Sequence, residues 1–226
     1  NIMNTDKLGQ EPDKTQSDKI WKIENYRKKN QFAKQGQIVC TGSSLMEMFP
    51  IEKFIEESHI DKIVYNRGIG GFITEELKNV LDVCVLDLHP SRVFINIGTN
   101  DLSDSRIPME TIMANYDEII SRIENEIPNV EIYLMAYYPV NFDAAAPEMK
   151  DCLKIRTNEK INAANAWVKK LAEKHGQRYI DINRNLKDEQ GRLKAEYTIE
   201  GMHINEAGYK AIFEDFIKYV NEPSWK

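Results

Sequence analysis

Ile38-Val39-Cys40-Thr41-Gly42-Ser43-Ser44-Leu45 is an apolar run of β-forming residues that ends in a small glycine–serine turn. The chain then continues into residues 46–49, which have the character of a helix start, before Pro50 stops it. In open α/β sheets, ligands bind at the edge where strands end in this way. A serine in such a turn is a candidate nucleophile if a base reaches it. Serine is also a preferred helix N-cap, so capping by Ser43 and Ser44 is the alternative interpretation.

Strands and helices alternate along the rest of the chain. After the strand at 38–41 we expect further strands at 62–66, 92–97, 130–136 and 178–182, and helices at 17–35, 74–88, 112–127, 161–175 and 207–220. The run at 92–97 is almost continuously apolar, which suits a parallel strand buried on both faces. Crossovers of this length join parallel strands. The pattern predicts a doubly wound, three-layer α/β/α domain around a mostly parallel, five-stranded sheet.

The composition indicates one ordinary globular domain. The chain has 226 residues, of which 42% are hydrophobic and 29% charged, and its net charge is -6. This negative balance does not favour a nucleic-acid partner. No apolar run is long enough to span a bilayer. Cys40 and Cys84 lie in apolar runs and are expected to be buried thiols, and the odd count of three cysteines argues against a disulfide framework.

The beginning of the chain differs from the rest. It starts at Asn1 rather than Met, and residues 1–18 are polar and contain Gly9 and Pro12. We expect a flexible polar leader over residues 1–18, followed by a single domain over 19–226 that begins with a helix. Leaders of this kind follow secretory cleavage sites, which favours a periplasmic or secreted location.

Polar residues gather where the predicted strands end. Ser44 follows the first strand, the glycine-rich turn 67–71 the second and Asn100 the third, while His203 with Glu200 lies in a late loop. Acyl transfer needs these groups. A histidine can take the proton of a serine hydroxyl while a carboxylate holds its other nitrogen, and Asn amides and glycine N–H groups can stabilise an oxyanion.

The other three histidines each have a structural interpretation, which leaves His203 as the candidate base. His175 lies at a helix C-terminus, where a cation is favoured, His59 lies in a charged run, and His89 precedes Pro90 in a connection. His203 is the histidine that has a carboxylate three residues before it in a short loop leading to the last helix.

Four blocks of the chain resemble the SGNH hydrolase superfamily, also called GDSL-type esterases and lipases. They occur in the family's order, within a resemblance that covers roughly residues 37–220, and are Gly42-Ser43-Ser44-Leu45, Asn66-Arg67-Gly68-Ile69-Gly70-Gly71, Gly98-Thr99-Asn100-Asp101 and Glu200-Gly201-Met202-His203. The resemblance implies the family's flavodoxin-like fold. Two positions depart from the pattern: Ser43 replaces the usual aspartate before the nucleophile, and Glu200 replaces the aspartate of the triad.

The resemblance also implies roles for single residues. Ser44 would be the nucleophile and would donate its own N–H to the oxyanion, with Asn100 as the side-chain donor. Gly71 is the best match for the backbone donor of the second block, and Gly70 is the alternative. His203 would be the base, with Glu200 as its partner, because Ser-His-Glu triads occur on other hydrolase folds.

The expected activity is hydrolysis of short-chain, acetyl-type esters, with a small ester or an acetylated sugar as substrate and neither a cofactor nor a metal. Ser43, Tyr137 and Tyr138, together with Asn141, are candidate substrate-contact residues. Three alternatives stay open: a lysophospholipase or acetyl-lipid hydrolase, a non-catalytic binding domain that keeps the fold, and a metal-dependent hydrolase, although no cluster here has ligand spacing such as His-Glu-x-x-His.

Overall fold

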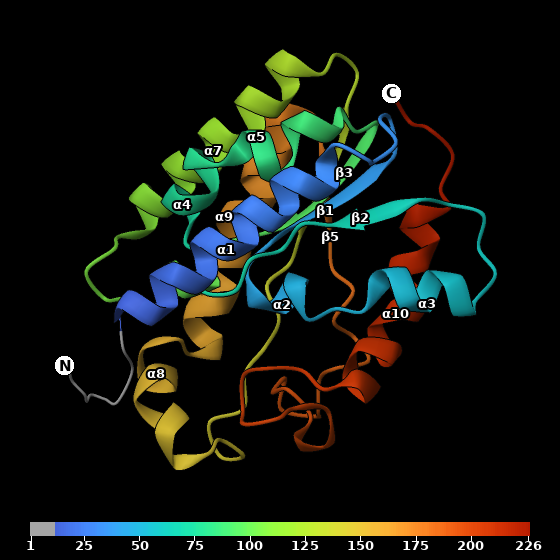
Figure 1. Ribbon diagram of the computed structural model, residues 1–226. Helices are drawn as coiled ribbons and strands as arrows, with labels where there is room; N and C mark the ends of the chain where they lie inside the picture. Colours follow the sequence, from blue (N-terminus) through green and yellow to red (C-terminus); the bar gives the residue numbers. More distant parts are fainter. Residues whose placement is uncertain (1–11) are drawn as a thin grey trace.

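The computed structural model describes residues 12–226, and within them five strands form one parallel sheet (Figure 1). The strands are β1 (Ile38–Gly42), β2 (Val64–Asn66), β3 (Arg92–Asn96), β4 (Glu131–Met135) and β5 (Arg178–Ile180). Their order is β2-β1-β3-β4-β5, so the chain winds first to one side of β1 and then to the other. Every pairing is parallel; Gly42, for example, is paired with Asn96. The predicted α/β fold is confirmed.

The other elements are helices, most of which connect one strand to the next. They are α1 (Pro12–Asn30), α2 (Ser44–Glu47), α3 (Ile51–Glu57), α4 (Thr74–Asn79), α5 (Leu81–Cys84), α6 (Thr99–Leu102), α7 (Met109–Glu126), α8 (Lys150–Ile155), α9 (Asn158–His175) and α10 (Glu206–Val220), with short 3-10 helices η1 (Leu86–Leu88), η2 (Pro147–Met149) and η3 (Ala195–Tyr197).

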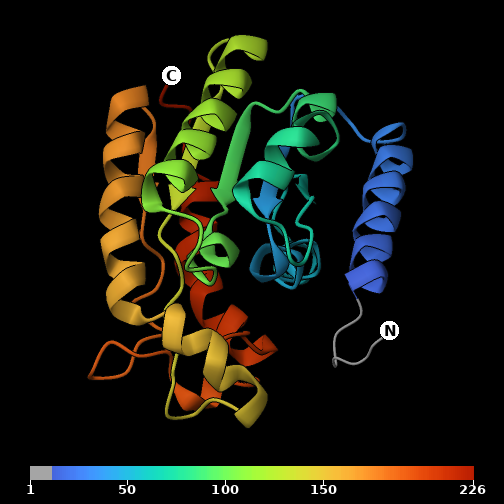
Figure 2. The ribbon, with the colours of Figure 1, turned by 90° about the vertical axis from the view of Figure 1, so that its left-hand side faces the viewer.

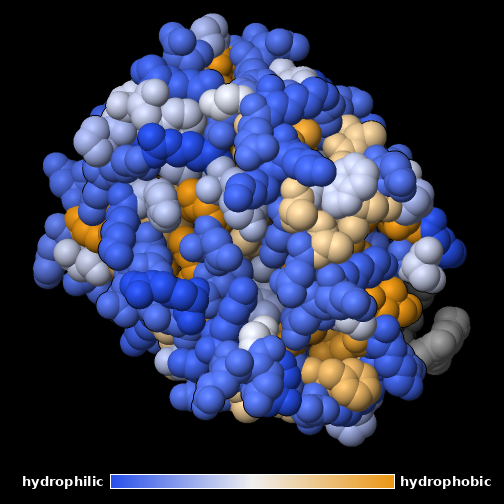
Figure 3. Space-filling view, turned by 180° about the vertical axis from the view of Figure 1, so that it is seen from behind, coloured by the Kyte–Doolittle hydropathy of each residue, from blue (hydrophilic) through white to orange (hydrophobic). Residues whose placement is uncertain are grey.

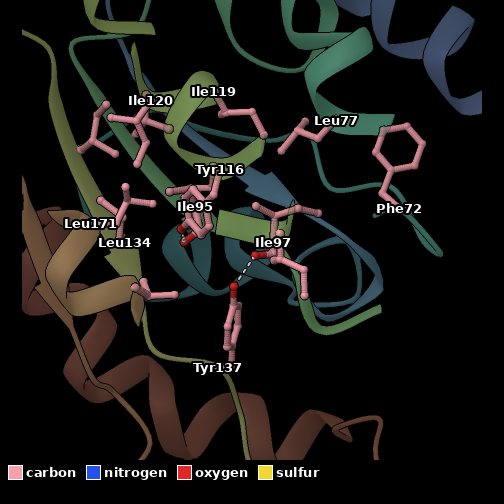
Figure 4. Close-up of a cluster of buried hydrophobic side chains, with 14 of the residues drawn as sticks. Phe72, Leu77, Ile95, Ile97, Tyr116, Ile119, Ile120, Leu134, Tyr137 and Leu171 are labelled. Atoms are coloured by element: carbon pink, nitrogen blue, oxygen red, sulfur yellow. Dashed lines mark hydrogen bonds between the residues drawn. The ribbon is translucent and has the colours of Figure 1, made fainter. Parts of the chain in front are cut away.

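Helices cover both faces of the sheet, and each face has its own apolar core. α1, α4, α5, α7 and α9 lie on one face, and α2, α3 and α10 lie on the other (Figure 1); α7 and α9 run side by side in Figure 2. Successive side chains of β3 point alternately into the two cores. Ile95 lies near Tyr116 and Leu134 in the first core (Figure 4), whereas Phe94 stacks on Tyr133 at 4.6 Å in the second.

The first helix differs from the prediction in its ends. α1 spans Pro12–Asn30 rather than 17–35, so the part of the expected leader at 12–18 is helical, while residues 1–11 lie outside the described residues. Ile20 and Trp21 are 61% and 66% exposed, whereas Tyr26 is buried. The helix therefore packs through the face that carries Tyr26 and partly buried Ile23, while Ile20 and Trp21 face outward.

Helix boundaries elsewhere were only partly predictable. The helix expected at 74–88 is broken into α4, α5 and η1, because Val80 and Val85 leave the helical region with φ of -125° and -146°. α3 and α8 were not predicted, since each is only six or seven residues long and has few apolar positions. The bounds of the five strands, whose carboxyl ends form the edge of the sheet, agree with the predicted bounds to within two residues.

The described surface is mainly hydrophilic. Figure 3 shows the back of the molecule, where apolar residues are scattered among charged and polar ones. Between Pro12 and Lys226 there is no helix with the length and hydropathy required to cross a bilayer. Cys40 and Cys84 are buried free thiols, as predicted, and burial raises the pKa of Cys84 to about 12.

Asp215 ties α10 to the segment after β5. Its carboxylate accepts hydrogen bonds from Arg184 at 2.7 and 3.0 Å and from Lys218 at 3.1 Å. The hydrogen bonds from Arg184 are the main cause that lowers the pKa of Asp215 below its usual value of 3.8, and the hydrogen bond from Lys218 adds to it. Together they outweigh burial, which raises the pKa. A carboxylate with a lowered folded pKa stabilises the protein above its unfolded pKa, and this contribution is lost as the pH falls through the folded pKa.

We expect Asp215→Asn to lower the free energy of unfolding by about 1 kcal/mol at neutral pH, a small effect because the Arg184 side chain that pairs with it is mostly exposed. The difference from wild type should shrink once the pH falls below about 4. Urea unfolding at neutral pH and near about pH 3 measures both effects. Exposed Glu214 on the same helix supplies the control Glu214→Gln. A difference that persists undiminished in acid would contradict the assignment.

Candidate active site

Ser44 lies at the carboxyl end of β1, as the first residue of α2. The turn that exposes it requires Gly42, because a Cβ there would lie 2.3 Å from the carbonyl oxygen of Asn96 on the neighbouring strand. Ser43 is the N-cap residue, but its side chain makes no capping hydrogen bond and is buried. The Ser44 Oγ instead lies 3.4 Å from Nε2 of His203. Capping thus does not explain this pair of serines.

The loop before α10 holds His203 in a defined orientation. Glu200 Oε2 is in hydrogen-bond contact with His203 Nδ1, and Glu200 Oε1 accepts the backbone N–H groups of His203 and Met202 at 2.7 and 3.1 Å. Thr198 closes the loop, because its Oγ1 donates to the carbonyl of His203 at 2.7 Å. The imidazole therefore has Glu200 at one nitrogen and Ser44 at the other.

Glu200 is held in its ionised form. Partial burial raises the pKa of its carboxyl group, but the hydrogen bonds and charge of His203, with the backbone N–H of Met202, outweigh burial and leave the pKa below its usual value. A carboxylate in this state can stabilise an imidazolium ion when His203 takes a proton.

Asn100 lies at the carboxyl end of β3, the strand paired with β1. Its Nδ2 donates one hydrogen to the carbonyl of Phe72 at 2.9 Å, which leaves the second amide hydrogen for another acceptor. The neighbouring Asp101 is buried and accepts the N–H and hydroxyl of Thr74 at 3.0 and 2.7 Å. These contacts attach the short helix α6 to the segment that follows the glycine-rich turn.

The glycine-rich turn packs directly against the serine. A Cβ built on Gly70 would lie 3.6 Å from the Cβ of Ser44. The N–H of Gly70 already donates to Glu47 Oε1 at 2.7 Å. The N–H of Gly71 has no acceptor among the described residues, and its φ of +81° favours glycine there. Of the two glycines, Gly71 is therefore the one with a donor free for a ligand.

The expected substrate-contact residues are not at the surface of the site. Tyr137 and Tyr138 are each 1% exposed, and the Tyr137 hydroxyl donates to the carbonyl of Ile97 at 2.7 Å (Figure 4). Asn141 is buried and donates to the carbonyl of Leu193 at 2.9 Å. The structure thus gives no support to the predicted substrate contacts of these residues and of buried Ser43, because the segments after β1 and β4 turn these side chains into the core.

The other histidines have structural positions. His175 lies between Asp117 and Glu124, so it joins the end of α9 to α7. His59 and His89 occupy left-handed turn positions with φ of 55° and 44°. Among residues 12–226 no three His, Cys, Asp or Glu side chains are grouped so that they could hold a metal ion.

Two residues that lie beside the site, Glu47 and Arg156, were not predicted from the sequence. Glu47, one helical turn after Ser44, contacts the glycine-rich turn, and that spacing was the available signal. Arg156 is buried beneath the loop that carries Glu200, with its Nη1 2.8 Å from Sδ of Met202. No local pattern distinguishes Arg156 from a surface arginine.

The parallel sheet and the groups at its carboxyl edge define a three-layer α/β protein of the SGNH type. Residues 51–211 match the model of the GDSL-like Lipase/Acylhydrolase family, and the chain belongs to this family. The resemblance seen in the sequence is thereby confirmed.

Individual relatives extend this result. A solved structure provisionally described as a platelet activating factor from Streptococcus pneumonia is 30% identical, with a TM-score of 0.82, covering 92% of this chain and 95% of that one. An acetylxylan esterase from Geobacillus stearothermophilus shares the fold, with a TM-score of 0.64 at 15% identity over 85% of this chain and 98% of that one. An N-acylneuraminate cytidylyltransferase from Escherichia coli is 26% identical over 85% of this chain, which spans only 42% of that relative's length.

Proposed function

We propose that the protein is a serine esterase that removes short acyl groups, acetyl above all, from an alcohol of a carbohydrate. One observation carries this proposal: Ser44, His203 and Glu200 are in contact in that order. Ser44 Oγ lies 3.4 Å from Nε2 of His203, and Nδ1 of the same ring is hydrogen-bonded to the ionised carboxylate of Glu200. Family membership makes hydrolysis of an acyl ester the expected reaction.

In the proposed mechanism, Ser44 Oγ attacks the ester carbonyl while His203 Nε2 takes its proton. The charge that develops on the carbonyl oxygen is stabilised by the N–H groups of Ser44 and Gly71 and by Nδ2 of Asn100. The imidazolium then returns the proton to the leaving alcohol, and an acyl group stays on Ser44. Water, activated by the same histidine, releases the acid and restores the hydroxyl.

Two observations support a short acyl group and a sugar. Polar or backbone groups lie beside Ser44, namely the imidazole of His203 and the glycine-rich turn, and the amide of Asn100 lies on the same edge of the sheet. They offer little apolar area for a long chain. In addition, one relative with this fold is named an acetylxylan esterase, and another is named for a reaction of N-acylneuraminate, which is also a sugar.

Acyl-chain length tests this proposal. An enzyme that buries a long chain gains about 0.8 kcal/mol for each CH₂ group it removes from water, so its kcat/KM rises along the series. We expect the opposite order for p-nitrophenyl esters: acetate fastest, butyrate slower and octanoate slowest. A rise towards octanoate would contradict the short-chain assignment.

A comparison of natural substrates tests which kind of alcohol carries the acyl group. Acetylated xylose oligomers and O-acetylated sialic acid should lose acetate faster than an acetylated glycerophospholipid of platelet-activating-factor type. The lipid is the specific rival, because the name of the 30% identical structure points to it. Faster release from the lipid would overturn the sugar assignment and leave the esterase assignment intact.

A further inference from the structure

We infer that Glu47 is a positioning residue for the oxyanion site, and that helix α1 braces it through Lys22. In this arrangement the Glu47 carboxylate holds the N–H of Gly70, so that the next N–H in the turn, that of Gly71, stays directed to the reacting oxygen. The inference deepens the proposed function and rests on it.

Glu47 connects the nucleophile to the glycine-rich turn by a direct route. It lies three residues after Ser44 on α2, so the two side chains lie on neighbouring positions of one helix face. Its Oε1 accepts the Gly70 N–H at 2.7 Å. Gly70 in turn lies against the Cβ of Ser44, at 3.6 Å from an ideally built Cβ. A shift of Glu47 would therefore move the turn relative to the serine.

Helix α1 covers the same turn from outside. Lys19, Lys22 and Tyr26 are spaced three and four residues apart, which puts them on one helix face. Tyr26 donates its hydroxyl to the carbonyl of Gly68 at 2.6 Å, in a buried hydrogen bond. The Lys19 side chain crosses Gly71, with Cε 3.1 Å from the place of a Cβ, and its Nζ pairs with Glu76 at 2.8 Å. Tyr26 thus holds the turn and Lys19 the segment after it, while Lys22 reaches Glu47 on α2.

Lys22 has a second role, which is electrostatic. Its Nζ lies 3.1 Å from Oε1 of Glu47, and both side chains are about 30% exposed. A carboxylate beside a developing oxyanion would oppose its formation, because like charges a few ångströms apart repel. The ammonium group of Lys22 offsets that charge. Glu47 can then hold the Gly70 N–H by hydrogen bonding without making the oxyanion less stable.

This role predicts a distinctive set of variants. Glu47→Ala removes the acceptor of the Gly70 N–H, and we expect kcat to fall about 10- to 100-fold, less than the loss of a direct oxyanion donor, with KM changed less than about twofold. Glu47→Gln keeps an oxygen acceptor, so it should retain kcat within about threefold of wild type. Lys22→Met should lower kcat about three- to tenfold in the wild-type background and have no effect in Glu47→Gln, because the charge to be offset is gone.

The measurements are steady-state kinetics with p-nitrophenyl acetate and the rate at which a fluorophosphonate labels Ser44. Glu56→Ala and Lys28→Met, at exposed positions on α3 and α1, are the matched controls. Thermal unfolding identifies any variant that loses activity only because it is unstable. Wild-type kcat in Glu47→Ala, or an equal loss in Glu47→Gln and Glu47→Ala, would overturn the inference.

Hydrogen exchange at the Gly70 amide gives a readout that does not need turnover. We expect exchange at least about tenfold faster in Glu47→Ala than in wild type, and near-wild-type exchange in Glu47→Gln. If the wild type hydrolyses no ester, the proposed function fails, and the inference about the oxyanion fails with it. If the wild type is active but neither kcat nor exchange responds to Glu47→Ala, the inference alone fails.

Discussion

Ser44→Ala is expected to reduce kcat on p-nitrophenyl acetate about a million-fold, the loss typical when a serine nucleophile is removed from a working triad. The reason is chemical, because His203 then has no hydroxyl to deprotonate and no acyl-enzyme can form. KM should change little, since the hydroxyl contributes little to binding the ester in its ground state. Steady-state kinetics of wild type and variant measure both constants.

A matched control and a covalent probe make this test decisive. Ser58→Ala alters an exposed serine at the end of α3 and should leave kcat unchanged. A fluorophosphonate should form one adduct, on Ser44, in wild type and in Ser58→Ala, and none on residue 44 in Ser44→Ala. Equal inactivity of all three proteins, with no adduct, would favour the alternative of a binding domain that keeps the fold.

Glu200→Gln is expected to lower kcat about ten-thousand-fold, which is severe but far less than the loss of Ser44. The glutamate accepts hydrogen bonds through both oxygens, from the backbone N–H of His203 and from its Nδ1. A glutamine can present one oxygen only. If that oxygen keeps the backbone donors, the amide NH₂ faces Nδ1 and forces the ring proton onto Nε2. The nitrogen beside Ser44 then can no longer act as a base.

This second prediction is measured under the same conditions, with Glu196→Gln as the control because Glu196 is exposed and lies in the same segment. Equal losses in Glu200→Gln and Ser44→Ala would mean that the carboxylate does more than orient and stabilise the histidine. Full activity in Glu200→Gln would show that another group is the partner of His203.

Much of the candidate site was predictable because its residues belong to short motifs, several of them at strand ends. Ser44 and Asn100 each lie within a few residues of a buried strand, so the parallel pairing of β1 with β3 brings them to one edge. Glu200 and His203 are three residues apart and meet within one loop. Such relations depend on local spacing and on strand direction, and both can be read from the order of residues.

The direction of side chains was not predictable in the same way. Tyr137 and Tyr138 follow β4 as predicted, yet both side chains lie in the core, where the Tyr137 hydroxyl bonds the carbonyl of Ile97 on a neighbouring segment. In each case the neighbours that decide burial come from distant parts of the chain.

The sequence by itself determined the α/β class, the five strands and the family motifs that gather a serine, a histidine, a carboxylate and an amide at one edge. Only the tertiary structure decided which glycine N–H is free, that Glu47 holds the other, and that α1 lies across the turn with Lys19, Lys22 and Tyr26. The physical reason is that hydrophobic periodicity and strand order act through neighbours along the chain. Which donor pairs with which acceptor depends on how separate segments pack, to within a fraction of an ångström.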